Sequence, residues 1–232
     1  MPNPLQRHDT SPILELQNVH YALKSDQDTL NIINACNLSV ATNESVAIIG
    51  RSGSGKSTLL ALMAGLQSPT SGDITLLGKA LTTLSEDQRA QVRAQQVGFI
   101  FQNFQLMPSM SALENILMPL ELFQVDDAKT KALHALEQVG LAHRASHRPA
   151  ELSGGEQQRV AIARAFVTHP KILFADEPTG NLDEETAQQI QALLFELNRT
   201  LNTTLILVTH DVQFAQKCDR VLRLTQGHLS QD

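Results

Sequence analysis

Most of the chain alternates between short, mostly apolar stretches and longer segments with helical periodicity. The apolar stretches lack the polar–apolar alternation of a half-exposed strand, which is typical of strands buried on both faces of a parallel sheet. Strands that alternate with helices in this way predict an α/β fold. The predicted core strands are residues 46–49, 97–101, 171–177 and 204–209, and the main helices between them are residues 58–64, 152–167 and 184–198.

A second group of strands is predicted outside this core. Residues 13–19 alternate apolar and polar positions, as a strand with one exposed face does, and residues 32–40 and 73–77 also predict strands. The first two predict a small antiparallel sheet beside the core sheet, and residues 73–77 are a further short strand. The tail, residues 221–230, predicts a closing hairpin around a turn at 226–227.

The pattern changes between residues 103 and 151, where little strand signal remains. A helix is predicted over residues 111–120, because Ser111 followed by Glu114 forms a capping-box pattern. A second helix is predicted over residues 127–139, with three apolar residues on its core face: Leu133, Leu136 and Val139.

These elements fit one domain over residues 1–232, a length that can bury a full core. We expect residues 13–102 and 152–232 to form the α/β core, with its mixed sheet, and an antiparallel β subdomain. Residues 103–151 are expected to form a helical insertion into that core.

Composition and charge argue against several classes of protein but do not identify the function. No run of about eighteen or more apolar residues is present, so no segment is predicted to span a bilayer. Residues 1–12 are polar and Pro-rich, which is typical of neither a signal peptide nor a transit peptide. The two cysteines, Cys36 and Cys218, lie far apart, which favours reduced thiols in a cytoplasmic protein. A net charge of −6 without a basic block argues against a nucleic-acid partner.

The first core strand runs directly into a glycine-rich loop, residues 50–57, that fits the P-loop pattern G-x-x-x-x-G-K-S/T. Glycines allow close approach of a ligand, and the N–H groups of the loop and of the following helix cradle phosphate oxygens. Lys56 then lies between the β- and γ-phosphates, and the Ser57 hydroxyl is a ligand for Mg²⁺. The expected nucleotide-binding residues here are Gly50, Arg51, Ser52, Gly53, Ser54, Gly55, Lys56, Ser57 and Thr58.

The other core strands end on polar side chains, at the sheet edge where open α/β sheets bind ligands. We expect Asp176 to hold Mg²⁺ through water and Glu177 to orient or deprotonate the attacking water. Gln102 can touch both the metal and that water, and His210 can donate to the γ-phosphate. Adjacent acids at a strand end can also be only a solvated turn, but the upstream P-loop favours the catalytic interpretation.

The sequence Leu-Ser-Gly-Gly-Glu at residues 152–156 opens a helix, and by itself it is only a plausible helix cap. Together with the P-loop it resembles the signature of ABC-type ATPases, with Glu156 in place of the usual Gln. The resemblance covers essentially the whole chain, and the order of its motifs makes it specific. Tyr21 resembles the aromatic residue that stacks on adenine, and residues 50–57 resemble the Walker A motif.

The remaining motifs of that family follow in order. Gln102 resembles the Q-loop glutamine, and residues 172–176 followed by Glu177 resemble Walker B and the catalytic glutamate. Residues 181–183 resemble the D-loop, and His210 the switch histidine. The resemblance implies ATP and Mg²⁺ as cofactors, with the metal near Ser57, Gln102 and Asp176. It also implies a head-to-tail homodimer, in which one copy's signature faces the other copy's γ-phosphate, and this adds further ATP-binding residues: Ser153, Gly154, Gly155 and Asp183.

The implied function is that of the ATP-binding and ATP-hydrolysing subunit of an ABC transporter-type membrane complex. A separate integral membrane permease-type subunit would supply the membrane span, which places this chain on the cytoplasmic face of the inner membrane. Residues 105–115 and 176–183 resemble one branch, that of lipoprotein-releasing (LolD), macrolide-exporter (MacB), FtsE-type and YbbA-like ATPases. The work done is then export, lipoprotein release or mechanical transmission.

Three points stay open at this level. Tyr21 can instead fill the core, and its neighbour His20 can be the stacking ring. A soluble ABC ATPase acting on DNA or ribosomes is an alternative function, although such proteins usually carry an extra coiled coil, zinc module or second ATPase domain. Four apolar residues can form a docking surface for the membrane subunit or can pack within the insertion: Phe104, Leu106, Met107 and Met110.

Overall fold

The computed structural model describes residues 11–24, 29–94 and 96–231, so most of the N-terminal segment assessed for targeting lies outside the described residues. The larger of its two sheets contains β3 (Ser45–Ile49), β6 (Val97–Ile100), β7 (Ile172–Asp176), β8 (Thr204–Thr209), β9 (Arg220–Thr225) and β10 (His228–Gln231). The strand order is β10-β9-β3-β8-β7-β6, and only the β10–β9 hairpin is antiparallel. The predicted mixed core sheet and the predicted closing hairpin are confirmed.

The smaller sheet contains β1 (Leu14–Lys24), β2 (Thr29–Val40), β4 (Ser71–Leu76) and β5 (Lys79–Ala80). Its order is β2-β1-β4-β5, and all pairs are antiparallel. The first two strands are longer than the sequence predicts. Register shifts interrupt their pairing between Leu16 and Ala22, and such bulges break the simple alternation from which strand ends are predicted.

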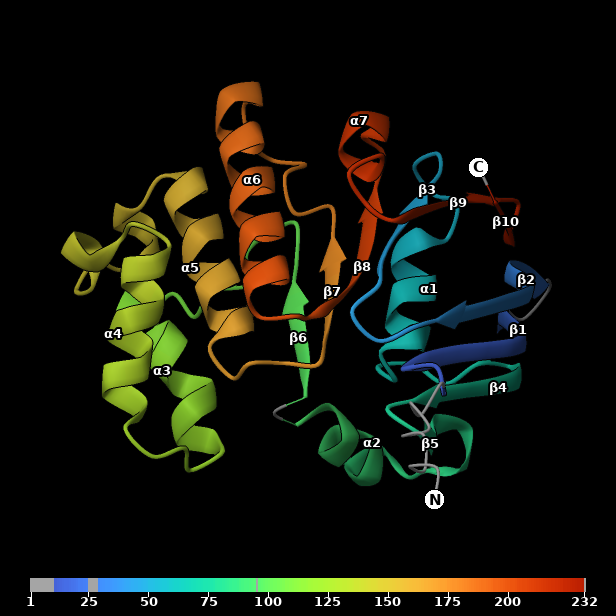
Figure 1. Ribbon diagram of the computed structural model, residues 1–232. Helices are drawn as coiled ribbons and strands as arrows, with labels where there is room; N and C mark the ends of the chain where they lie inside the picture. The colour runs from blue at the N-terminus through green and yellow to red at the C-terminus, as the bar shows by residue number, and fades with distance from the viewer. Residues whose placement is uncertain (1–10, 25–28, 95, 232) are drawn as a thin grey trace, which may run out of the picture.

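Helices cover both faces of the core sheet (Figure 1). On one face, α1 (Lys56–Met63) lies between the two sheets. The other face is covered by α5 (Gly154–Phe166) and α6 (Glu184–Thr200), with α3 (Ala112–Leu122) and α4 (Ala128–Gln138) outside α5. The remaining helical elements are α2 (Glu86–Arg93), α7 (Val212–Ala215) and short 3-10 turns at Leu81–Thr83, Ala142–Arg144 and Pro149–Glu151.

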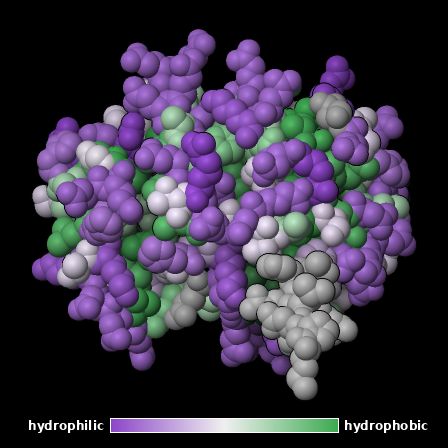
Figure 2. All heavy atoms as spheres, in the orientation of Figure 1, coloured by the Kyte–Doolittle hydropathy of each residue, from purple (hydrophilic) through white to green (hydrophobic). Residues whose placement is uncertain are grey.

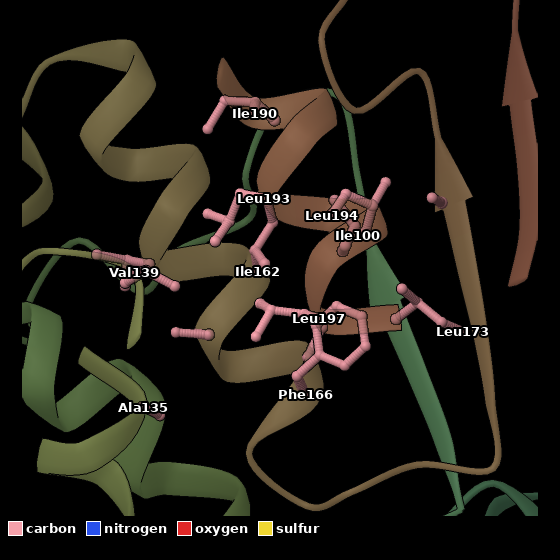
Figure 3. Packing of buried hydrophobic residues seen from close by; sticks show 14 of the residues in the cluster. Ile100, Ala135, Val139, Ile162, Phe166, Leu173, Ile190, Leu193, Leu194 and Leu197 are labelled. Atoms are coloured by element: carbon pink, nitrogen blue, oxygen red, sulfur yellow. The ribbon is translucent and has the colours of Figure 1, made fainter. Parts of the chain in front are cut away.

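This layering explains why the core strands are apolar at consecutive positions. In β3, Val46 and Ile48 belong to the cluster that includes α1, whereas Ala47 and Ile49 belong to the cluster on the α5–α6 face. All four side chains are buried. A strand with helices on both faces has no exposed face to carry polar residues. Figure 3 shows the α5–α6 side, where Ile162, Phe166 and the apolar face of α6 pack over Leu173 and Ile100, and Figure 2 shows a largely hydrophilic outer surface.

The helices after β6 differ from the prediction in one respect. The capping box of α3 is confirmed, because Ser111 Oγ accepts from the N–H of Glu114 and Glu114 Oε2 accepts from the N–H of Ser111. On α4, however, the prediction that Leu133 faces the core is wrong: it is 42% exposed. Ala132 and Ala135 are buried instead, because α4 packs against α3 and α5 and small residues allow that approach.

Candidate active site

The glycine-rich loop joins β3 to α1 at the carboxyl edge of the core sheet. Gly55 caps the helix with φ 97°, a left-handed conformation. A Cβ at this position would lie 2.9 Å from Ile32 Cγ2, so the loop passes directly under β2. At Gly50 a Cβ would lie 2.6 Å from the carbonyl oxygen of Leu224 on β9. Both glycines are required by close approach of neighbouring strands.

Lys56 connects this loop to β7. Its Nζ atom donates to the carbonyl oxygens of Gly50 at 3.0 Å and Arg51 at 3.2 Å, and lies 3.8 Å from Glu177 Oε1. The side chain is only 8% exposed, so its charge is directed into the loop and not into bulk solvent. A buried ammonium beside a ring of phosphate-binding N–H groups is suited to neutralising phosphate charge.

Ser57 and Asp176 form an oxygen pair at the start of α1. The Ser57 hydroxyl donates to Asp176 Oδ1 at 3.1 Å. Burial raises the pKa of the Asp176 carboxyl above its usual value, an effect that the hydrogen bond from Ser57 opposes. Hydroxyl and carboxylate oxygens are the hard donors that Mg²⁺ prefers, and their proximity fits a shared divalent cation, which would favour the ionised carboxylate.

Glu177 lies at the centre of the polar cluster. Its backbone has φ 46°, an unusual conformation for a residue with a side chain, and its N–H donates to the carbonyl oxygen of Val208 on β8. Its Oε2 atom lies 2.8 Å from Nδ1 of His210 and accepts from the His210 N–H at 3.3 Å. The neighbouring strand therefore fixes the direction of the carboxylate.

Gln102 is connected to the loop that follows β7. Its Nε2 atom donates to Asn181 Oδ1 at 3.1 Å, and Asn181 Nδ2 donates back to the Gln102 carbonyl oxygen at 3.0 Å. At the end of this loop, Asp183 caps α6 by accepting from the N–H of Thr186, and hydrogen bonds from Thr186 lower the pKa of its carboxyl. The loop thus joins the active-site edge to the start of α6.

One cavity of about 580 Å³ is bordered by five of these polar residues: Lys56, Ser57, Gln102, Glu177 and His210. Its lining residues are Leu30, Ile32, Ser52, Gly53, Gly55, Lys56, Ser57, Thr58, Gln102, Glu177 and His210. The other predicted loop residues, Gly50, Arg51 and Ser54, line an adjacent cavity on the β9 side of the loop. A slightly larger cleft, about 670 Å³, lies at the opposite sheet edge, but its polar residues bond to one another, as in the 2.7 Å contact of Ser45 with Asp219.

Several predicted residues do not line the cavity, among them Asp183 and Asp176, although Asp176 accepts a hydrogen bond from the cavity residue Ser57. Ser153, Gly154 and Gly155 are at the start of α5, where Ser153 forms a capping box with Glu156, and none of them lines it. Tyr21 is not among its lining residues either: its side chain is partly exposed, and it packs against the core cluster that includes its register partner Ile33.

Sequence reasoning missed Leu30 and Ile32 as cavity residues. Both are aliphatic residues on β2, so their type suggests no chemistry, and the close approach of β2 to Gly55 places them in the cavity wall. Their position in the cavity wall can be recognised only in the folded chain.

A P-loop at the carboxyl edge of a core sheet, facing a paired acid and a histidine, defines a P-loop ATPase. The ABC transporter family profile matches residues 33–180. The chain belongs to this family. Among the described residues, no helix has the length and apolar character needed to cross a membrane.

Similar proteins agree with this assignment. The chain is 49% identical to an uncharacterized ABC transporter ATP-binding protein, YbbA, of Escherichia coli K12, over 95% of this chain and 97% of the relative. It is also 49% identical to the lipoprotein-releasing system ATP-binding protein LolD of Legionella pneumophila strain Lens, over 94% and 96%. A dimeric structure of the ATP-binding cassette MJ0796 with ADP and Pi, in a post-hydrolysis state, matches with TM-score 0.86 and 36% identity, over 94% and 98%.

The chain is thus an ATP-binding, ATP-hydrolysing subunit of an ABC transporter-type complex, with the predicted fold of this family. The alternative function, a soluble ATPase acting on DNA or ribosomes, finds no support in these similarities.

Proposed function

We propose that the cavity binds ATP together with Mg²⁺, and that the polar side chains along its wall divide the work of hydrolysis. The observation that supports this most directly is the placement of Glu177 between Lys56 and His210 inside a cavity bordered by the P-loop. Lys56 neutralises the β- and γ-phosphates, Glu177 orients and deprotonates the attacking water, and His210 donates to the γ-phosphate. Ser57 and Asp176, with Gln102 beside them, supply oxygens for Mg²⁺, which offsets phosphate charge when bound.

The working unit in this proposal is a head-to-tail homodimer. The signature residues Ser153, Gly154 and Gly155 lie outside the chain's own cavity, so they are available to a second copy. A phosphate suits the first turn of α5, because N–H groups there lack helical partners. The dimeric form of the similar MJ0796 cassette supports this arrangement. Asp183, at the start of α6, then lies near the same junction.

The proposed docking surface for a separate integral membrane subunit is the loop before α3. Two side chains hold its backbone. Asn115, which is fully buried, accepts from the N–H of Met107 and donates to the carbonyl oxygens of Met107, Met110 and Ser111. Arg164 donates to the carbonyl oxygens of Phe104 and Gln105. The loop held in this way presents Met107, 45% exposed, to solvent, while Leu106 packs against the core.

We assign the parts of the domain by these two functions, ATP hydrolysis and contact with the membrane subunit. In our proposal residues 13–102 and 152–232 form the ATPase core and β subdomain, and residues 103–151 form the helical insertion that meets the membrane subunit. The complex lies on the cytoplasmic face of the inner membrane. Its work is export, lipoprotein release or mechanical transmission, a range supported by the similarity to the lipoprotein-releasing LolD and to YbbA.

Co-purification from membranes tests whether the chain has an integral membrane partner. A tagged Glu177→Gln chain, expressed in its native host, is recovered from detergent-solubilised membranes with and without ATP. We expect a stoichiometric integral membrane protein, recovered best with ATP. Met107→Asp should reduce that recovery, whereas Leu133→Asp, at a residue of similar exposure on α4, should not. Recovery of soluble proteins alone would contradict the membrane assignment while leaving the ATPase assignment intact.

A further inference from the structure

Glu156, the last residue of the signature sequence at 152–156, uses both of its carboxylate oxygens. Its Oε2 atom accepts from the N–H of Ser153 at 2.8 Å, as part of the capping box of α5. Its Oε1 atom accepts from Nε of Arg144 at 3.0 Å. The carboxylate is therefore held against the start of α5, and its side chain is only 22% exposed.

Arg144 reaches Glu156 from the helical insertion. It ends the 3-10 turn Ala142–Arg144, and the chain just after it is fastened to α3, because the N–H of Ala112 donates to the carbonyl oxygen of His147. Nη1 of Arg144 also donates to Nε2 of His147 at 3.1 Å. The guanidinium is thus held by His147 as well as by Glu156, in a segment whose backbone is anchored to α3.

A carboxylate in the first turn of α5 suits the helix dipole but opposes the binding of a phosphate at the same place. The N–H groups of Gly154 and Gly155 have no acceptors within the helix, and in the proposed dimer they face the γ-phosphate held by a second copy. The glutamine that is usual at residue 156 would carry no charge there. Among the residues that the structure describes, Arg144 is the only basic side chain in an ion pair with Glu156.

We propose that Arg144 is a positioning residue of the signature: it neutralises Glu156 and holds it against the start of α5, so that the N–H groups there can receive the γ-phosphate of ATP bound to a second copy. The inference rests on the proposed homodimer. Arg144 acts through Glu156, so its charge matters only while residue 156 is a carboxylate. The arginine and the glutamate together take the place of one neutral glutamine.

ATP-dependent dimerisation measures this effect without turnover. The Glu177→Gln chain serves as the parent, and its dimer dissociation constant in saturating Mg²⁺-ATP is measured by analytical ultracentrifugation. Arg144→Gln in this parent should weaken the dimer by about tenfold, because each of two equivalent sites loses about threefold. The affinity of the monomer for mant-ATP should stay the same, since Arg144 does not line the chain's own cavity.

A second substitution separates the charge of Arg144 from its shape. Adding Glu156→Gln to Arg144→Gln removes the unpaired carboxylate and leaves an amide that can still cap α5. We expect this double variant to dimerise as tightly as the parent that carries Glu156→Gln alone. If Arg144 only holds the insertion against α5, the double variant should instead dimerise as weakly as Arg144→Gln.

Arg148→Gln is the matched control. It removes the same charge from the same segment, but the charge of Arg144, and not that of Arg148, acts on the Glu156 carboxylate. This control should leave the dimer unchanged. Arg148 is exposed and the side chain of Arg144 is 36% exposed, so these variants should fold, which thermal melting checks.

The outcomes separate the inference from the homodimer on which it rests. An unchanged dimer in Arg144→Gln, or no rescue by Glu156→Gln, would overturn the inference and leave the homodimer standing. If the Glu177→Gln parent itself does not dimerise with ATP, the homodimer is contradicted, and the inference with it.

Discussion

Oε2 of Glu177 lies 2.8 Å from Nδ1 of His210 and also accepts the His210 backbone N–H at 3.3 Å. Its other oxygen is 3.8 Å from Lys56 Nζ. A carboxylate held from two sides in this way has little freedom to rotate, and such preorganisation is what a general base requires. The positive φ of Glu177 is the backbone conformation that aims the side chain into the cavity.

Replacing this carboxylate should separate binding from turnover. We predict that Glu177→Gln lowers the rate of phosphate release at saturating Mg²⁺-ATP by about a hundredfold or more, because an amide cannot accept the proton of water. ATP affinity should change little, since the amide keeps the size of the side chain. Glu184→Gln, at an exposed position in the first turn of α6, is the control and should retain full turnover. Normal turnover in Glu177→Gln would exclude its catalytic role.

Removing the loop lysine should act on binding. Lys56→Ala deletes a buried ammonium that holds the carbonyl oxygens of Gly50 and Arg51 and faces the phosphates. We predict loss of measurable ATP binding in a mant-ATP titration, with the fold retained by circular dichroism. Lys79→Ala, which removes an exposed lysine on β5, should bind ATP normally. If Lys56→Ala binds ATP with unchanged affinity, the P-loop assignment fails.

Arg164 should stabilise the loop before α3. Its guanidinium donates to the carbonyl oxygens of Gln105 at 2.7 Å and Phe104 at 3.0 Å, two residues with φ of 48° and 59°. Burial lowers the pKa of Arg164 from its usual high value, but the group remains charged. We predict that Arg164→Ala costs about 1–3 kcal/mol of unfolding free energy, measured by urea titration, because it leaves both carbonyls without this donor. Lys131→Ala, an exposed change on α4, should cost almost nothing, and an equal loss there would contradict the role of Arg164.

Glu156, in the signature sequence, should make the free energy of unfolding depend on pH. A hydrogen bond from the Ser153 backbone N–H holds the pKa of Glu156 below its ordinary value of 4.5, and the Ser153 side chain and the charge of Arg144 act in the same direction. The unfolded chain therefore binds this proton at higher pH than the folded chain does, so stability rises with pH in this range. Glu156 contributes fully above about pH 4.5, and its contribution is lost as pH falls through the lowered value.

Glu156→Gln tests that dependence. The amide oxygen can still cap α5, but it does not titrate. Urea titrations at several pH values between about 3 and 6 should show the advantage of the unaltered chain over Glu156→Gln growing with pH and then levelling off. A constant difference across this range would contradict the prediction.

The core of the fold was predictable because its strands and its phosphate-binding loop can be recognised from short, continuous stretches of sequence. Each core strand is apolar at consecutive positions because helices cover both sheet faces. The glycine-rich loop is a motif of eight consecutive residues, 50–57. The long pairing of β1 with β2 was not predictable in detail, because its bulges depend on contacts with distant residues. For the same reason Leu133 was assigned to the core, whereas the close approach of α4 to its neighbours buries Ala132 and Ala135.

The candidate site divides in the same way. Gln102, Glu177 and His210 could be placed from sequence because parallel strands deliver their final residues to one edge. Tyr21 was predicted to stack on adenine because an aromatic ring follows the first strand directly; its side chain is partly buried against the core cluster, and its role in base binding stays a prediction. Leu30 and Ile32, which also line the cavity, belong to no motif, so only the three-dimensional arrangement reveals them.

The central claim is that each ATP site needs a P-loop from one copy and a signature from the other. Complementation tests it directly. Lys56→Ala and Ser153→Arg chains, each inactive alone, are mixed, and phosphate release is measured. Half of the dimers should be mixed, and each of these has one intact P-loop facing one intact signature, so activity should recover to about a quarter of the unaltered value. No recovery from two folded chains that form mixed dimers, or full activity of Ser153→Arg alone, would contradict the account.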